Sequence, residues 1–240
     1  MTKILILTHK YDRHFYFVNK ILEKYNNNTK VFLNCKTKNE TFYEKIKRKF
    51  NYKFKLKNII LNLLFYHYGM KFIKEKEFVE KKYFKNQKKL FYSKYKKNIL
   101  GKVEKSDKSL NDYNCTKKII GYKADLILVM GTCLIEETII NSAKYIINIH
   151  TGLSPYYRGG YSNLWPFLNY DFNFFGVTVH KLTSGIDAGD IIYSKNIENK
   201  NNYSFAELNS IAITKGTELM IKAIEKFIEG NLKSIPQWEK

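Results

Sequence analysis

The side chains best suited to chemistry lie at the end of an apolar run at residues 144–149. Asn148 and His150 flank Ile149, and the two-residue period of a strand places both side chains on one face. An amide donor beside an imidazole can polarise a carbonyl group and manage a proton. Taken alone, however, the pair fits a capped strand with a structural histidine better.

A second chemical candidate is Asp187, in the stretch 183–191, where glycines stand on both sides of it at 185 and 189. A carboxylate held in such a loop can orient His150 and raise the pKa of its imidazole. The alternative is an ordinary hairpin with Asp187 and Asp190 in solvent, and the loop by itself favours that alternative. His180, further upstream, is expected to be a structural strand residue.

The elements that must position these residues follow from hydrophobic periodicity. A strand at 3–7, a helix at 15–24 and a strand at 30–34 form a β-α-β start, which is typical of a parallel sheet. Further strands are expected at 124–130, 144–149, 175–182 and 191–197, with a helix at 135–143. Ser204, with Glu207 as a capping box, begins a helix to about Ile228 that Gly230 ends. Ligands of such sheets bind outside the carboxyl ends of the strands.

Charge is concentrated in one segment. The formal net charge is +20, and residues 36–105 hold 22 Lys/Arg and 6 Asp/Glu, a net of +16. Four apolar residues at helical spacing predict a helix over 71–97: Phe72, Val79, Tyr83 and Leu90. We expect a helical insert whose lysines stay in solvent. The large number of lysines is expected to reflect an AT-rich coding sequence. Contact with an anionic membrane surface is the alternative for this segment, and nucleic-acid binding is not expected.

The length and composition indicate one domain with a substantial core, since 44% of the 240 residues are hydrophobic. No apolar run approaches the roughly 18–20 residues of a membrane span, and the start of the chain does not resemble a signal peptide. The three cysteines, Cys35, Cys115 and Cys133, have no metal-ligand spacing. A cytoplasmic protein without a metal is therefore expected.

Taken together, three stretches resemble the folate-dependent formyltransferase family. Asn148-Ile-His150 followed by Ser154-Pro-Tyr-Tyr-Arg-Gly159 is similar to the family's asparagine, histidine and proline–arginine–glycine signature. Gly176-Val-Thr-Val-His180 is similar to the strand that follows, and Asp187-Ala-Gly189 with Ile191 to the aspartate loop. The order and spacing agree over residues 124–197.

The resemblance implies an α/β Rossmann-like, mostly parallel sheet with flanking helices and 10-formyltetrahydrofolate as the formyl donor. It also implies a catalytic set of Asn148, His150 and Asp187, which stabilise an oxyanion and remove the proton of the attacking amine. Which of His150 and Asp187 is the general base stays open. The folate is expected to lie between two turns, held by Gly131, Cys133, Leu134, Ile135, Ser184, Gly185 and Asp187.

The acceptor is expected to be a nucleotide-linked amino sugar, a 4-amino-4,6-dideoxy or 3-amino-3,6-dideoxy hexose for surface glycan synthesis. Gly152-Leu-Ser-Pro155 replaces the family's usual Ser-Leu-Leu-Pro, and Trp165 fits the sugar enzymes. The short stretch after Asp187 argues against a tRNA substrate. The residues expected to bind the acceptor are Lys10, Arg13, Tyr157, Arg158 and Gly159.

We expect a catalytic domain at 1–205, with the insert at about 36–105, and a short helical tail at 206–240. A homodimer is compatible with the sequence. The alternatives are a glycinamide ribonucleotide formyltransferase-like enzyme and a non-catalytic basic binding protein.

Overall fold

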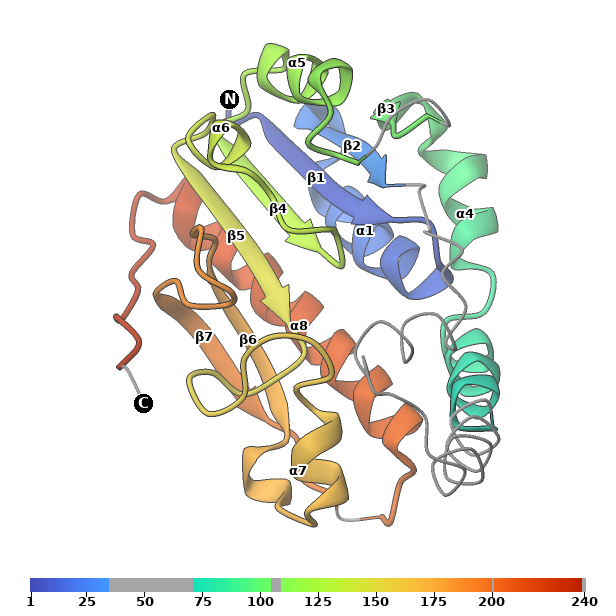
Figure 1. Ribbon diagram of the computed structural model, residues 1–240. Coiled ribbons are helices and arrows are strands. Elements are labelled where there is room, and N and C mark those ends of the chain that lie inside the picture. Colours follow the sequence, from blue (N-terminus) through green and yellow to red (C-terminus); the bar gives the residue numbers. More distant parts are fainter. Residues whose placement is uncertain (35–70, 105–108, 200, 239–240) are drawn as a thin grey trace, which may run out of the picture.

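The computed structural model describes residues 1–34, 71–104, 109–199 and 201–238. The strands in these residues are β1 (Ile4–His9), β2 (Thr29–Asn34), β3 (Ile99–Lys102), β4 (Leu126–Met130), β5 (Tyr145–His150), β6 (Gly176–Lys181) and β7 (Ile191–Asn196). They form one sheet in the order β3-β2-β1-β4-β5-β6-β7 (Figure 1). The first five of these are parallel, whereas β6 is antiparallel to β5 and β7 is antiparallel to β6. The predicted Rossmann-like, mostly parallel sheet is confirmed.

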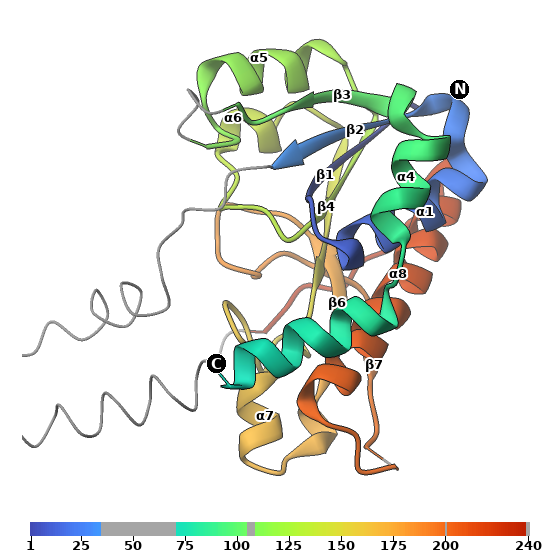
Figure 2. The same ribbon diagram turned by 90° about the vertical axis from the view of Figure 1, so that its right-hand side faces the viewer.

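Helices cover both faces of the sheet. The α-helices are α1 (Asp12–Tyr25), α4 (Gln87–Lys94), α5 (Tyr113–Gly121), α6 (Glu137–Ile140), α7 (Leu164–Leu168) and α8 (Phe205–Ile228), and residues 71–83 are also helical. Short 3-10 turns occupy Asn26–Asn28, Lys96–Asn98 and Phe172–Phe174. Figure 2 shows α1, α4 and α8 on one side of the sheet and α5 and α6 on the other. The helix predicted at 135–143 is reduced to the single turn of α6.

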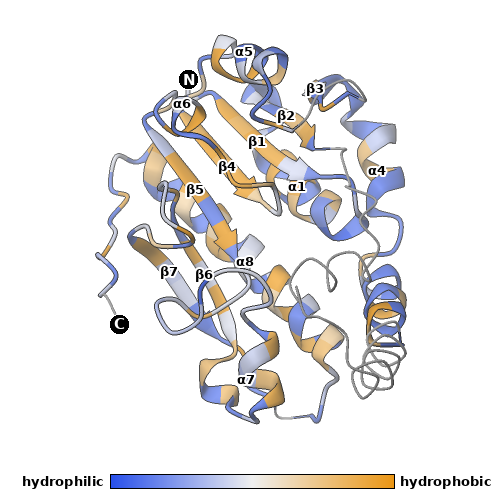
Figure 3. Cartoon of the chain, in the orientation of Figure 1, coloured by the Kyte–Doolittle hydropathy of each residue, from blue (hydrophilic) through white to orange (hydrophobic). Residues whose placement is uncertain are grey.

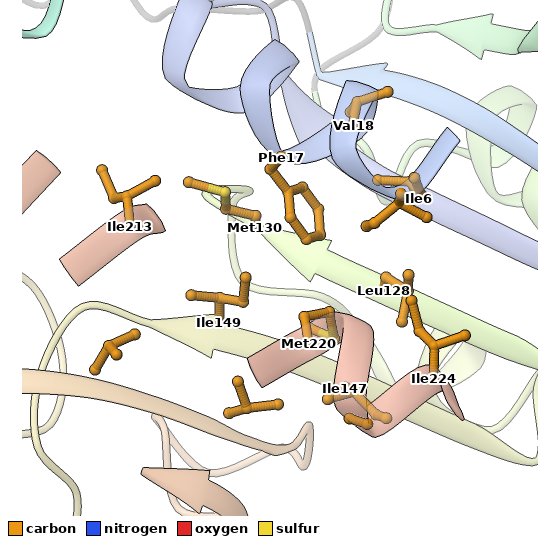
Figure 4. Packing of buried hydrophobic residues seen from close by; sticks show 14 of the residues in the cluster. Ile6, Phe17, Val18, Leu128, Met130, Ile147, Ile149, Ile213, Met220 and Ile224 are labelled. Atoms are coloured by element: carbon orange, nitrogen blue, oxygen red, sulfur yellow. The ribbon is translucent and has the colours of Figure 1, made fainter. Parts of the chain in front are cut away.

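The two core clusters show which face of the sheet each strand side chain occupies. On β5, Ile147 and Ile149 join the cluster that α1 and α8 cover, where Met220 of α8 also lies (Figure 4). Ile146 joins the cluster on the opposite face, beneath α5 and α6. Since strand side chains alternate, Asn148 and His150 must share the face of Ile146. The apolar colour of the central strands in Figure 3 agrees with burial on both faces.

The lysine-rich segment differs in part from its prediction. Residues 71–83 and α4 confirm helical structure, but the fully buried contacts are Phe84 and Phe91. The predicted Phe72 packs against the core, whereas the predicted Tyr83 is 47% exposed, because the helix ends there and Phe84 of the following turn takes the buried position. Ile99–Lys102 is the edge strand β3 rather than part of a helical insert. The remainder of the predicted insert, 36–70 and residue 105, lies outside the described residues.

The helix α8 is part of the main core. Its predicted start is confirmed, because the Ser204 hydroxyl accepts the backbone N–H of Glu207 and the Glu207 carboxylate accepts that of Ser204. Gly230 follows the helix with a φ of +74°. Leu208, Met220 and Ile224 are fully buried against the sheet. Helix α8 therefore packs as a layer against the sheet.

Candidate active site

The site begins at the carboxyl end of β5, where Asn148 and His150 are 9% and 7% exposed. The neighbouring strand β6 pairs in a register that sets His180 opposite Asn148 and Thr178 opposite His150. Val177 and Val179 of β6 enter the α8 cluster, so Thr178 and His180 point to the other face. The antiparallel pairing therefore gathers an amide and two imidazoles on one face of the sheet.

Asp187 completes this group. Its Oδ2 lies 3.1 Å from His150 Nδ1 and accepts the Gly159 N–H at 3.0 Å. Its Oδ1 accepts from Asn148 Nδ2 at 3.3 Å and lies 3.4 Å from His180 Nε2. The structure thus brings together the three side chains expected to be catalytic, although two of them lie 37 or more positions from the third.

Glycine is required at two positions around this group. A Cβ atom on Gly152 would lie 2.4 Å from His150 Nε2, and one on Gly189 would lie 1.9 Å from the Lys181 carbonyl oxygen. The first glycine leaves room for the imidazole, and the second lets the Asp187 loop close onto β6. The glycine-rich character of this part of the sequence therefore has a local steric cause.

The protonation of His150 is set by opposing effects. Burial lowers the pKa of the imidazole, and the negative Asp187 together with the hydrogen bond to the Tyr157 carbonyl opposes that shift. Burial outweighs the other two, so the pKa of His150 lies below its ordinary value. At neutral pH the ring is uncharged and carries one N–H, whereas both ring nitrogens face acceptors. When that N–H points to Asp187, Nε2 carries the lone pair, and the Tyr157 carbonyl beside it stabilises a proton that Nε2 accepts.

Asp187 is ionised at neutral pH. Burial raises the pKa of its carboxyl group, but the His180 hydrogen bond, the nearby His150 and the Gly159 N–H together lower it further. The net pKa is below the ordinary aspartate value. A fixed negative charge therefore stands beside His150 and favours its protonated form during proton transfer.

His180 belongs to the site, although the sequence indicated only a structural role. The ring is fully buried, and its Nδ1 lies 2.6 Å from the Lys181 carbonyl oxygen, which can only accept. Nδ1 therefore donates to that carbonyl, and Nε2 lies 3.2 Å from Asn148 Nδ2 and 3.4 Å from Asp187 Oδ1. The Asp187 carboxylate, which only accepts, fixes which way the Asn148 amide points. The alternation of His180 with two valines was the available signal, but its meaning depended on the β5–β6 register.

The residues predicted to hold folate lie in two loops on the same face as Asn148. Ile135, after β4, and Leu182, after β6, both pack against the cluster beneath α5 and α6. Leu134 is 70% exposed and Ile186 is 57% exposed. The loop residues Gly131, Cys133, Ser184 and Gly185 flank these apolar side chains. A further residue, Asn111, braces the first loop by donating to the Leu134 carbonyl and accepting from the Glu136 N–H.

The residues predicted to bind the acceptor fall into two groups. Tyr157 and Gly159 contact the catalytic group through their backbone carbonyl and N–H, whereas Arg158 donates to Gln237 Oε1 at 3.0 Å. Lys10 and Arg13 follow β1, two strands from β5 and roughly 10 Å across the sheet. Arg13 is already paired with Glu80 at 2.6 Å, which leaves Lys10 as the more available cation.

The strand order sets a topological switch point between β1 and β4. The chain passes from β1 to β2 on one side and later returns to place β4 on the other side. The loops after β1 and β4 therefore diverge, and α/β proteins bind ligands at such a switch point. Within the described residues, no cluster of histidine, cysteine, aspartate or glutamate could hold a metal ion, and no helix is long and apolar enough to span a membrane.

Comparison with known proteins identifies the family of this chain. The family model described as formyl transferase matches residues 73–224. A methionyl-tRNA formyltransferase from Clostridium acetobutylicum is 31% identical over 132 residues, which are 54% of this chain and 42% of that protein. The chain thus spans about two fifths of the length of this curated relative.

Two solved structures share the fold. A glycinamide ribonucleotide transformylase from Symbiobacterium toebii aligns with a TM-score of 0.61 at 14% identity, over 99% of this chain and 95% of that one. An N-formyltransferase from Helicobacter canadensis, in complex with folinic acid and dTDP-3-aminofucose, aligns with a TM-score of 0.53 at 17% identity, over all of this chain and 68% of that one. At these identities the likeness concerns the fold. The family match covers more than half of the sequence, and the chain belongs to the formyl transferase family.

Proposed function

We propose that this protein transfers a formyl group from 10-formyltetrahydrofolate to the amine of a nucleotide-linked amino sugar. The observation that carries the proposal is the contact of Asp187 with both His150 and Asn148 at the carboxyl end of β5. A family scaffold kept only for binding would not need this arrangement, in which a charged carboxylate, an uncharged imidazole and an amide share one buried group. The site therefore favours an enzyme over a basic binding protein.

The roles of the residues follow from their geometry. When the amine adds to the formyl carbon, negative charge develops on the formyl oxygen, and an N–H donor in a buried site stabilises it. Asn148 Nδ2 has a second N–H beside the one bonded to Asp187, and His150 becomes a donor through Nε2 once it is protonated, because its Nδ1 faces Asp187. Asp187 stabilises the imidazolium that forms if His150 takes the amine proton. The proton then passes to the departing folate nitrogen as the carbon–nitrogen bond to the donor breaks.

The exposed apolar residues of two loops support a folate donor. Leu134 and Ile186 are exposed residues of the loops after β4 and β6, and Ile135 and Leu182 of the same two connections pack on the face to which Asn148 points. A flat aromatic ring system between apolar side chains, with its polar edges on backbone groups, is a common mode of ligand binding. The Helicobacter canadensis relative, which holds folinic acid, makes a reduced folate the natural donor to propose here.

The choice of an amino-sugar acceptor rests on sequence and on the same relative. The Gly152-to-Pro155 turn departs from the usual family motif, and Trp165 of α7 is 56% exposed. The Helicobacter canadensis structure holds dTDP-3-aminofucose. Lys10 follows β1 at the switch point, and we assign it to the diphosphate of the acceptor.

A panel of acceptors tests the proposal. The purified chain is given 10-formyltetrahydrofolate with one amine at a time, and release of tetrahydrofolate is followed with mass analysis of the product. The amines are dTDP-linked 3-amino-3,6-dideoxy and 4-amino-4,6-dideoxy hexoses, glycinamide ribonucleotide and methionyl-tRNA. Turnover of an amino sugar with His150-dependent formation of an N-formyl product is expected.

Two other acceptors have specific support. Methionyl-tRNA is favoured by the identity to the Clostridium acetobutylicum enzyme, and glycinamide ribonucleotide by the fold match that covers 95% of the Symbiobacterium toebii enzyme. Turnover of only one of these two would refute the amino-sugar proposal while retaining formyl transfer. Folate binding without turnover of any amine would instead restore the non-catalytic alternative.

A further inference from the structure

The segment after α8 returns to the catalytic loop. Ile235 and Ile191 exchange both of their backbone hydrogen bonds, each at 2.8 Å, so the segment runs antiparallel to the start of β7. Figure 1 shows this segment descending beside β7. The pairing brings Gln237, a residue to which the sequence gave no role, next to the loop that carries Asp187.

The amide of Gln237 joins three partners. Its Nε2 donates to the Asp187 carbonyl at 3.0 Å and to the Gly189 carbonyl at 2.6 Å. Its Oε1 accepts from Arg158 Nε at 3.0 Å. The orientation of the amide follows from chemistry, because carbonyl groups only accept and a guanidinium group only donates. The side chain therefore uses both of its N–H groups on the Asp187 loop.

Asp187 needs such a restraint. Its φ of +47° lies in the left-handed region, which costs a non-glycine residue free energy and persists only where the surroundings hold it. An aspartate in the ordinary helical or extended region would direct its carboxylate elsewhere. Gln237 holds the main chain of Asp187, while the Gly159 N–H holds its carboxylate.

The two restraints are linked to each other. Gly159 directly follows Arg158, which is bonded to Gln237. The contacts thus form a closed ring from the Asp187 carboxylate to Gly159, Arg158, Gln237 and back to the Asp187 carbonyl. This ring of contacts holds the loop of Gly159 and the loop of Asp187 at a fixed separation around His150.

We propose that Gln237 is a positioning residue for formyl transfer, which keeps Asp187 in the left-handed conformation that turns its carboxylate to His150. The inference rests on the proposed function for its kinetic part, but its structural part can be measured without any substrate. Gln237 itself is not expected to touch either substrate.

The test compares two variants by amide hydrogen exchange and by kinetics. Gln237→Leu removes all three hydrogen bonds at similar size, and Gln237→Glu keeps the acceptor for Arg158 but loses both donors. In each, exchange of the Gly159 N–H should be about 10-fold to 100-fold faster, the range for loss of two hydrogen bonds. The NMR signals of the His150 ring should shift, and kcat should fall about 10-fold with a smaller change in KM.

Ser234→Ala is the matched control, because it removes a hydrogen bond between the same segment and Asp190 without touching Asp187. It should retain wild-type exchange at Gly159, wild-type His150 signals and wild-type kcat. Wild-type behaviour of Gln237→Glu at Gly159 and His150 overturns the proposal, and so does an equal effect of Ser234→Ala. If Gln237→Leu does not fold, Gln237→Glu gives the result. Absence of formyl transfer by the wild-type protein refutes the proposed function, while the exchange measurement still decides the role of Gln237.

Discussion

Replacing Asp187 by asparagine probes the charge at the centre of the site. The carboxylate Oδ2 accepts from His150 Nδ1 at 3.1 Å and from the Gly159 N–H at 3.0 Å. An asparagine with its oxygen on this side keeps both contacts but has no charge. A hydrogen bond to a charged group contributes ~1.5–3 kcal/mol and a neutral one ~0.5–1.5 kcal/mol. The two contacts together therefore lose about 2 kcal/mol, and kcat should fall about 30-fold.

The same variant should also change the pKa of His150 in a definite direction. The charge of Asp187 opposes the lowering of the His150 pKa by burial, so its removal should lower that pKa further. The acidic limb of kcat, which reports loss of the uncharged base, should move to lower pH. The lowered pKa of Asp187 means that its carboxylate stabilises the fold above about pH 4 and that this contribution is lost as pH falls through the folded pKa. Asp187→Asn should therefore be less stable at neutral pH and match the wild type in strong acid.

The assay combines formyl transfer at several pH values with an NMR titration of the His150 ring, which requires no substrate. Asp190→Asn is the control, because Asp190 is a nearby carboxylate of the same loop that pairs with Lys181 at 2.9 Å. It should leave kcat and the His150 titration unchanged. A kcat of Asp187→Asn within about 3-fold of wild type, together with an unmoved His150 titration, would show that the contact has no part in the chemistry.

Three further changes test other parts of the structure. Asn148→Ala and His150→Ala should each reduce kcat by ~10²–10³ at nearly unchanged melting temperature, since each removes an oxyanion donor; near-normal rates in both would refute the assignment. Gly152→Ala should lower kcat and shift the His150 ring signals, because the new Cβ would lie 2.4 Å from His150 Nε2; wild-type kinetics would show that the ring can move without consequence. The protein should not sediment with anionic vesicles, because its exposed lysines lie beside Phe84 and Phe91, which pack in the core. Salt-sensitive pelleting would contradict this expectation if it is lost when four lysines are neutralised, namely Lys81, Lys82, Lys88 and Lys89.

Local patterns in the sequence determined the elements that carry the site. The apolar runs of β1, β4 and β5, the Ser204 capping box and the paired glycines around Asp187 each act over a few residues, so they can be read directly. The motif around Asn148 and His150 and the aspartate loop also sufficed to indicate the family. The family match from residue 73 to 224 bears this out.

The sequence was less informative where the outcome depended on the phase of a helix or on the pairing of a strand. The helix ends at residue 83, and the fully buried residues are Phe84 of the following turn and Phe91 of α4 rather than Tyr83 and Leu90. The strand at Ile99–Lys102 has no strong period of its own and is stabilised by pairing with β2. Neither result could follow from spacing alone, because a helix pattern does not reveal a break of one turn.

Tertiary structure alone decided the two additions to the site. His180 became a partner of Asn148 through the register of two antiparallel strands, and a slip of one residue would have turned its ring to the α8 face. Gln237 lies 50 positions from Asp187 and reaches it only because the chain pairs Ile235 with Ile191. Sequence fixes which groups a strand or loop can offer, whereas contacts between distant segments decide which groups meet, since those contacts depend on how whole elements pack.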